Sequence, residues 1–322
     1  MFDGSLTMSF NALNYPSHLF SNVNTHKSLY RARVKPVFAI PPSSVVLPTN
    51  KNSDSTKGDF SDLLLSQANT VGIIGGASEN STLNFLKKLV QWSSKDGQDC
   101  APFILCSDAE LNKELLTHER DSLPLLYRQN ELSKLDHISI VEKLRSKRVF
   151  LESSGARCIV MPCHISHSWH GEVSKGCSVE FLHMGDCVAR ELKEAKLKPL
   201  EAGSPLRIGV LGTSATLTAG FYQEKLQNEG FEVVLPDKAT MEHTIIPSIE
   251  ALNRNDMEGA RNLFRIALQV LLVRAVNTVI IASDDMRDLL PQNDPLLKKC
   301  IDPIDALVRS TIKWAQATGK VT

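Results

Sequence analysis

Short apolar runs alternate with amphipathic segments along the chain from about residue 66 onward. The segment 81–93 illustrates the second kind, because its apolar residues recur at spacings of three and four, the period of an α-helix. These runs predict strands at 71–74, 103–106, 158–161, 208–211, 231–235 and 279–282, and helices at 81–93, 108–116, 138–153, 167–173, 186–197, 217–228, 240–252, 257–274 and 303–317. Strands that alternate with helices predict an α/β protein with parallel sheets.

The pattern of strand, glycine turn and helix start occurs twice. Residues 71–76 read VGIIGG and residues 207–213 read RIGVLGT, and hydroxyl-rich helix starts follow both. Later in each half, a second apolar strand leads to a polar residue, Cys163 in the first half and Ser283 in the second. We therefore predict two pseudo-symmetric lobes, at 66–203 and 204–300, and a C-terminal helix within 301–322 that packs back on the first lobe.

Cys163 is the first candidate catalytic residue. Ligands of open α/β sheets bind at the carboxyl ends of the strands, so two similar lobes would place Cys163 and Ser283 face to face across a cleft. This geometry suits proton transfer on opposite faces of one small molecule. Cys163 also precedes a predicted helix, whose N–H groups favour an anion, so we expect a lowered thiol pKa, with His167 assisting. The alternative is that Cys163 is a small buried hydrophobe.

Short polar side chains gather in the two glycine turns. Glycine lets backbone N–H groups approach an anion closely, and the side chains suit the carboxylates of a small acid. Plain helix capping is the alternative interpretation. The candidate substrate-binding residues here are Gly76, Ser78, Asn80, Ser81, Thr82, Thr213, Ser214 and Thr216.

The sequence predicts neither a metal nor a cofactor. Cys163, His164, His167 and His170 have helical spacing and side chains that suit zinc, but no second cysteine or carboxylate completes a recognised zinc spacing. Neither glycine turn is a dinucleotide fingerprint, and the chain has no phosphate-binding loop, no serine-hydrolase elbow and no evident pyridoxal-phosphate lysine motif.

Charge and composition limit the classes of binding partner that the sequence favours. The formal net charge is zero and the pI is near 7.1, so nothing favours nucleic acid or an anionic membrane. No apolar run is long enough for a bilayer span. The seven cysteines are an odd number, and several fall in apolar strands, which favours reduced thiols. A small molecule is therefore the expected partner, and the only oligomer that we propose from the sequence is a homodimer.

The first 65 residues differ from the rest. Up to Ser53 the only acidic residue is Asp3, against several lysines and arginines and many serines and asparagines. This composition predicts an organellar transit peptide followed by a disordered linker, with the chloroplast as the expected destination and the mitochondrion as the alternative. An ordinary disordered tail is the other interpretation.

Four stretches carry a family resemblance: IIGG at 73–76, MPCHISH at 161–167, GVLGTSAT at 209–216 with AGFY at 219–222, and residues 280–290. Together they resemble the plant-type branch of the aspartate/glutamate racemase superfamily, over roughly residues 70–317. The resemblance implies two Rossmann-like lobes with an active-site cleft between them and no cofactor. It also implies two cysteines that act as opposed acid and base at the α-carbon of an acidic amino acid.

The sequence departs from the family pattern in both catalytic motifs. His164 and Ile165 stand where the family usually has Asn-Thr, and the run 282–285 reads ASDD where the family usually has Gly-Cys-Thr-Glu. Ser283 therefore replaces the second catalytic cysteine. The resemblance further implies a basic residue in the second lobe that binds the substrate carboxylate, for which Arg254 is the nearest candidate. His164 is a further candidate substrate-binding residue.

We therefore expect a cofactor-independent racemase- or epimerase-like enzyme for a small acidic amino acid or dicarboxylate. Cys163, tuned by His167, would serve one face, and Ser283, Asp284 or Asp285 the other. A serine hydroxyl is a poor base unless a neighbour takes its proton, so one of the aspartates would have to help. The alternatives are a one-cysteine isomerase or decarboxylase, and a non-catalytic protein that binds dicarboxylates or amino acids.

Overall fold

The computed structural model describes residues 44–46, 68–95, 100–121, 132–200 and 203–319. The predicted transit peptide, and the predicted linker apart from 44–46, lie outside the described residues. Both sheets belong to one compact unit, Pro41–Thr322. Among the described helices, none is long and apolar enough to cross a membrane.

The first sheet has five strands in the order β1-β3-β2-β4-β5. Its central strands are buried apolar runs and pair in parallel, as expected for strands joined by helical crossovers. β1 pairs antiparallel with β3 and lies in the stretch predicted as linker. The strands are β1 (Ser44–Val46), β2 (Val71–Ile74), β3 (Phe103–Cys106), β4 (Cys158–Val160) and β5 (Glu180–Phe181).

The second sheet has four parallel strands in the order β7-β6-β8-β9. The strands are β6 (Arg207–Gly212), β7 (Glu232–Val234), β8 (Thr278–Ala282) and β9 (Cys300–Ile301). In each sheet the strand that opens the lobe, β2 or β6, lies at the centre beside the strand that leads to Cys163 or Ser283. The predicted α/β fold with parallel sheets is confirmed.

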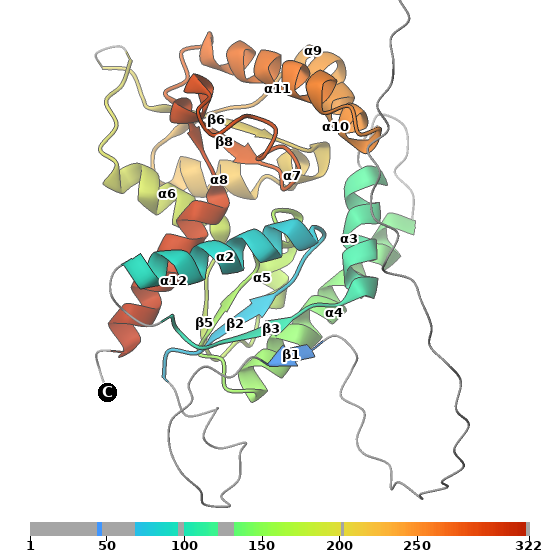
Figure 1. The fold of residues 1–322 in the computed structure, drawn as a ribbon, viewed down its shortest axis with the longest axis vertical. Helices are drawn as coiled ribbons and strands as arrows, with labels where there is room; N and C mark the ends of the chain where they lie inside the picture. Colours follow the sequence, from blue (N-terminus) through green and yellow to red (C-terminus); the bar gives the residue numbers. More distant parts are fainter. Residues whose placement is uncertain (1–43, 47–67, 96–99, 122–131, 201–202, 320–322) are drawn as a thin grey trace, which may run out of the picture. The chain divides into compact units, whose positions relative to one another are not determined.

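Helices flank both sheets (Figure 1). Those between the strands of the first sheet are α2 (Glu79–Lys95), α3 (Ala109–Asp121), α4 (Leu132–Ser153), the 3₁₀ turn η1 (Ile165–Trp169) and α5 (His170–Val173). α6 (Met184–Glu194) precedes the second sheet. The remaining helical segments are α7 (Ser214–Ala219), α8 (Phe221–Asn228), α9 (Lys238–Thr240), the π-helix η2 (Met241–Ile245), α10 (Ile246–Asn253), α11 (Met257–Leu272), the 3₁₀ turn η3 (Pro295–Lys299) and α12 (Pro303–Gly319).

Three predicted helices take a different form. The segment 167–173 is the 3₁₀ turn η1 followed by the single turn α5, the segment 217–228 is divided at Gly220 between α7 and α8, and the segment 240–252 contains a π-helix. The first difference matters for the site, because η1 directly follows Cys163 and His164. A short 3₁₀ turn aligns few peptide dipoles, so it offers an anion less than a full α-helix would.

One hydrophobic core joins the two lobes. It includes Val160 from the first sheet and Ile280 from the second, together with Tyr222 of α8 and residues of α6 and α12. α12 packs against α2 and α6, and Figure 1 shows α2 and α12 side by side. Lys88 of α2 reinforces that contact, because its ammonium lies 2.7 Å from Asp302 and also pairs with Asp305.

Candidate active site

Cys163 lies just beyond the end of β4, packed against the first glycine turn. Its sulfur accepts a hydrogen bond from the Ala77 backbone N–H at 3.3 Å, and its side chain is completely buried. A Cβ added at Gly76 would lie 2.0 Å from the Cys163 Cβ and 2.5 Å from its Sγ. Only glycine at position 76 therefore leaves room for the cysteine in this position.

The second lobe repeats this close approach. A Cβ added at Gly212, the last residue of β6, would lie 2.5 Å from the Ala282 carbonyl oxygen. Ala282 ends β8 and directly precedes Ser283. In each lobe, a glycine at or just beyond the end of the opening strand lets the chain that follows the neighbouring strand approach closely.

Burial, and to a smaller extent the nearby negative charge of Asp284, raise the pKa of the Cys163 thiol to about 12. The Ser166 side chain and the Ala77 N–H act in the opposite direction, with smaller effect. The expectation of a lowered thiol pKa is therefore wrong. Desolvation and a facing carboxylate outweigh the backbone N–H groups, because η1 is too short to favour the thiolate. Cys163 is a thiol, and hence a proton donor, at neutral pH.

Asp284 is the group that faces Cys163 from the second lobe. Only 9% of its side chain is exposed, and Oδ1 has no hydrogen-bond partner. Burial raises the pKa of Asp284 to about 7, and the charges of Asp285 and Asp302 also raise it, while the side chains of Ser81 and Cys163 hold it lower. The carboxyl can therefore either accept or release a proton near neutral pH.

His164 connects Asp284 to the inter-lobe core. Its Nδ1 lies 2.9 Å from the Tyr222 hydroxyl, and its Nε2 lies 3.4 Å from Asp284 Oδ1. Tyr222 donates its hydroxyl proton to Met184 Sδ at 3.1 Å.

His164 stays neutral at physiological pH. Burial lowers the pKa of its imidazole to about 4, and the charge of Arg287 also lowers it. His164 therefore brings no positive charge to Asp284. Its contact with Tyr222 links it to the hydrophobic core that joins the two lobes.

Glu119 is a site residue that the sequence did not predict. It lies in the last turn of α3, and its Oε1 accepts a hydrogen bond from Thr213 Oγ1 at 3.0 Å. Burial, together with the charges of Asp284 and Asp285, raises the pKa of Glu119 to about 7, although the Thr213 hydrogen bond and the charge of Arg120 act in the opposite direction. No motif marks this glutamate, since only the packing of α3 against α7 brings it to the second lobe.

The aspartates and serine of the run 283–285 take different positions. Ser283 is buried, with 2% of its surface exposed. Asp285 is exposed, yet desolvation still raises the pKa of its carboxyl. Of the three, Asp284 is the one whose charge acts on the Cys163 thiol.

The polar residues of the two turns are divided between capping and the site. Ser78 caps α2 by accepting the Ser81 N–H at 3.4 Å, and Asn80 is exposed. Ser81 is buried and acts on Asp284, and Thr82 is buried beside it. Thr213 caps α7 by accepting the Thr216 N–H at 3.4 Å, while its hydroxyl also reaches Glu119. Thr216 is buried and Ser214 is partly exposed.

His167 belongs to a cluster of rings. Its Nε2–H donates to the Met161 carbonyl at 2.9 Å, and its ring lies 4.8 Å from that of His183 and 5.9 Å from that of His170. Burial lowers the pKa of His167 well below its usual value, so the ring is neutral. A neutral ring brings no positive charge that would lower the pKa of the Cys163 thiol. Within the described residues, no group of three or more His, Cys, Asp or Glu side chains is arranged to hold a metal ion.

Arg254 is an exposed residue at the end of α10. Its guanidinium is 67% exposed and 3.9 Å from Glu250 of its own helix, and it caps α10. The expectation that it binds a substrate carboxylate has no support in this position.

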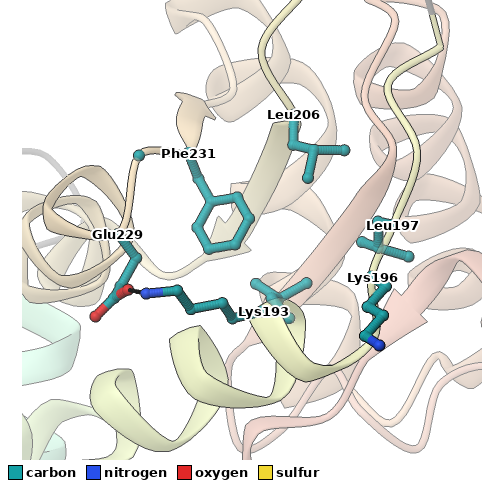
Figure 2. A pocket seen from close by; sticks show the side chains of 8 residues that line it. Lys193, Lys196, Leu197, Leu206, Glu229 and Phe231 are labelled. Carbon is teal, nitrogen blue, oxygen red and sulfur yellow. Dashed lines mark hydrogen bonds and ion pairs between the residues drawn. The ribbon is translucent and has the colours of Figure 1, made fainter.

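A surface pocket of about 230 Å³ is also separate from Cys163. It is formed by the end of α6 with Leu206, Glu229 and Phe231, and Figure 2 shows Lys193 paired with Glu229 across its rim.

The buried carboxyl of Asp284 predicts that the stability of the fold depends on pH. The folded-state pKa of Asp284, about 7, lies above the value of 3.8 for an unperturbed aspartate. Protonation therefore stabilises the fold, and this contribution is complete below about pH 4 and is lost as the pH rises through 7. Asp284→Asn, which stays neutral, should raise the melting temperature at pH 8 by ~2–4 °C or more and change it little at pH 4. Equal melting temperatures at pH 8 would contradict the buried charge.

Known proteins resemble this chain in sequence over most of its length. The sequence profile described as Asp/Glu/Hydantoin racemase matches residues 74–311. The broad specificity amino-acid racemase RacX of Bacillus subtilis (strain 168) is 23% identical over 243 residues, which cover 75% of this chain and 96% of RacX.

Solved structures show the same fold. An aspartate racemase homologue from Pyrococcus horikoshii OT3 superimposes with a TM-score of 0.59 at 22% identity, covering 77% of this chain and 99% of that chain. The aspartate racemase of Picrophilus torridus superimposes with a TM-score of 0.56 at 24% identity, covering 77% and 94%. The profile match spans most of the chain and includes both Cys163 and Asp284. This protein belongs to the Asp/Glu/hydantoin racemase family, and that membership supports a racemase-like function.

Proposed function

We propose that this protein is a cofactor-independent amino-acid racemase or epimerase in which Asp284 removes the α-proton and Cys163 donates its own proton to the opposite face. One observation carries the proposal. Two proton-bearing side chains, placed after equivalent strands of the two lobes, lie close enough that the charge of Asp284 acts on the Cys163 thiol. Proton transfer on opposite faces of one carbon needs this arrangement.

Asp284 and Cys163 account for both protons that move in the reaction. The Asp284 carboxylate takes the α-proton from one face of the amino acid, and the electron pair is held at the α-carbon and its carboxylate. The Cys163 S–H then gives its proton to the opposite face, which forms the mirror-image amino acid. Asp284 is left as the carboxylic acid and Cys163 as the thiolate. Proton exchange with water, or the reverse reaction, returns both groups to their starting state.

The resting protonation states suit this direction. With a pKa of about 7, Asp284 is ionised in a large share of molecules at neutral pH. With a pKa of about 12, Cys163 keeps its proton. Substrate must also displace the residues that cover Cys163, because the thiol has no exposed surface. An opening of the lobes is therefore part of the proposed cycle.

The substrate is a free amino acid. The family resemblance implies an acidic one, of the aspartate or glutamate type, and the printed name of RacX describes a broad-specificity amino-acid racemase. An assay of the full chain should therefore cover acidic, neutral and basic amino acids of both hands.

Chiral chromatography of these reactions tests the proposal. Wild type should convert at least one L-amino acid to its D-form, and Cys163→Ala should lower kcat/KM for it by ~10²-fold or more. Cys158→Ala is the matched control, because Cys158 is also fully buried and belongs to β4. Full activity of Cys163→Ala would refute the thiol's role. Binding of an amino acid without conversion of any would favour the non-catalytic alternative.

A further inference from the structure

A chain of polar side chains crosses the junction of the two lobes beside Asp284. The imidazole of His164, from the first lobe, lies between two groups of the second lobe. Its Nε2 is 3.4 Å from Asp284 Oδ1, and its Nδ1 is 2.9 Å from the hydroxyl of Tyr222 in α8. The Tyr222 hydroxyl lies 3.1 Å from Met184 Sδ of α6. Asp284 is therefore connected through His164 to a fixed partner in the core.

The position of one proton on His164 decides what Asp284 faces. His164 is buried, with 3% of its surface exposed, and Tyr222 and Met184 have no exposed surface. Burial keeps the imidazole neutral, with a pKa of about 4, so its two ring nitrogens share a single proton. If Nε2 carries that proton, Asp284 faces a hydrogen-bond donor. If Nδ1 carries it, Asp284 faces a lone pair.

Two observations favour a lone pair at Nε2. Tyr222 donates its one hydroxyl proton to Met184 Sδ, so the proton between Tyr222 and His164 has to come from Nδ1. In addition, Asp284 Oδ1 is a buried oxygen without a hydrogen-bond partner, although Nε2 lies only 3.4 Å away. An N–H at Nε2 directed at this oxygen would have supplied the partner.

A lone pair at Nε2 acts differently on the two forms of the carboxyl. The ionised Asp284 gains no hydrogen bond from it, whereas the carboxylic acid can donate its O–H to the nitrogen. This favours the protonated form and makes the carboxylate a stronger base. Contacts at a reaction centre are often long before substrate binds and shorten in the complex, so a separation of 3.4 Å allows this hydrogen bond to form.

Resting on the proposed function, we propose that His164 is a positioning residue: Tyr222 holds it with the proton on Nδ1, and its Nε2 accepts a hydrogen bond from the carboxylic acid form of Asp284. The α-proton thus arrives on a carboxyl whose O–H already has an acceptor. The proton stays on the Asp284 oxygen and His164 stays neutral, so no further charge is moved. His164 acts on the reaction only through Asp284.

Other ionisable groups also act on the two residues, and the test has to leave them in place. The groups whose charges interact with Asp284 or with His164 are Glu119, Cys163, Asp285, Arg287 and Asp302, and Arg120 interacts in turn with Glu119 and Asp285. Substitution of Tyr222 or Met184 retains all of them. Variants at these two positions therefore report on the His164 proton.

The test compares the pH dependence of kcat/KM for wild type, Tyr222→Phe and Met184→Leu. Tyr222→Phe removes the partner of Nδ1, and Met184→Leu removes the sulfur acceptor, which frees the hydroxyl proton for Nδ1. Either change should move the His164 proton to Nε2, where it donates to the Asp284 carboxylate. The acid limb, expected near pH 7 in wild type, should move lower by about one unit, and kcat/KM above it should fall ~tenfold because the base is weaker.

Thr311→Val is the matched control, because it removes another fully buried hydroxyl, which donates to the Leu307 carbonyl within α12. It should leave the acid limb where it is in wild type. An acid limb that stays in place in both Tyr222→Phe and Met184→Leu, or that moves to higher pH, would overturn the inference.

Nitrogen NMR of the full chain with labelled histidine decides the inference without turnover, and His164→Asn identifies the signals. In wild type, Nδ1 of His164 should carry the proton, and the Nε2 signal should shift as the pH passes 7, a shift that Asp284→Asn removes. A ring protonated at Nε2 would overturn the inference. If these signals are seen but no amino acid is turned over, the proposed function fails while the hydrogen bond between His164 and Asp284 is supported.

Discussion

Asp284→Asn is expected to lower kcat/KM for α-proton transfer by ~10²–10⁴-fold, the usual contribution of a positioned acid or base. Asparagine keeps the shape of the side chain but carries no transferable proton near neutral pH. Ser283→Ala should stay within ~threefold of wild type, because the charge that acts on the Cys163 thiol comes from Asp284. Steady-state rates on the preferred amino acid measure both effects.

The reverse result, in which Ser283→Ala abolishes activity and Asp284→Asn retains it, would return the second proton to the serine. The pH profile gives an independent check. The pKa of Asp284 is about 7, so kcat/KM of wild type should fall about tenfold per unit below that pH and level off above it. The apparent value belongs to the interacting Asp284–Cys163 pair.

Gly76→Ala is expected to produce the largest loss from a single methyl group. The added Cβ would lie 2.0 Å from the Cβ of Cys163, a fully buried residue that cannot move aside without moving backbone. Overpacking of this kind costs ~1–3 kcal/mol or more. A misplaced thiol should in addition lower kcat/KM by ~10²-fold. Thermal melts and rate measurements on the same preparation separate the two losses.

Gly171→Ala is the control for Gly76→Ala, because a Cβ there would meet no heavy atom within 4 Å. It should leave both the melting temperature and the rate close to those of wild type. A Gly76→Ala protein with wild-type melting and wild-type activity would show that the close packing of the turn on Cys163 does not position the thiol.

The sequence was sufficient to predict an α/β fold with parallel sheets, because continuous apolar runs mark the buried strands. The strands that bear Cys163 and Ser283 are fully buried apolar runs, and buried parallel strands have this pattern. β5 and β9 were not predicted, since two residues are too few to show a period. The helix expected after Cys163 became a 3₁₀ turn, and with it the expected lowering of the thiol pKa was lost.

The composition of the site depended on tertiary contacts that no local pattern contains. Glu119 has the sequence surroundings of any surface-helix glutamate, and only its bond with Thr213 identifies it. Asp284 stands beside the residue that matches the family's second cysteine, and the geometry was needed to choose between them. Arg254 was selected by charge and lobe alone, and it is an exposed residue at the end of α10.

Deuterium labelling tests the proton transfer between two opposed groups most directly. The full chain is incubated with one enantiomer of its preferred amino acid in D₂O, and both enantiomers are examined early in the reaction by mass spectrometry after chiral separation. Two groups that work on opposite faces predict product that carries deuterium at the α-carbon and remaining substrate that does not. No deuterium in either enantiomer, for every amino acid offered, would contradict the account.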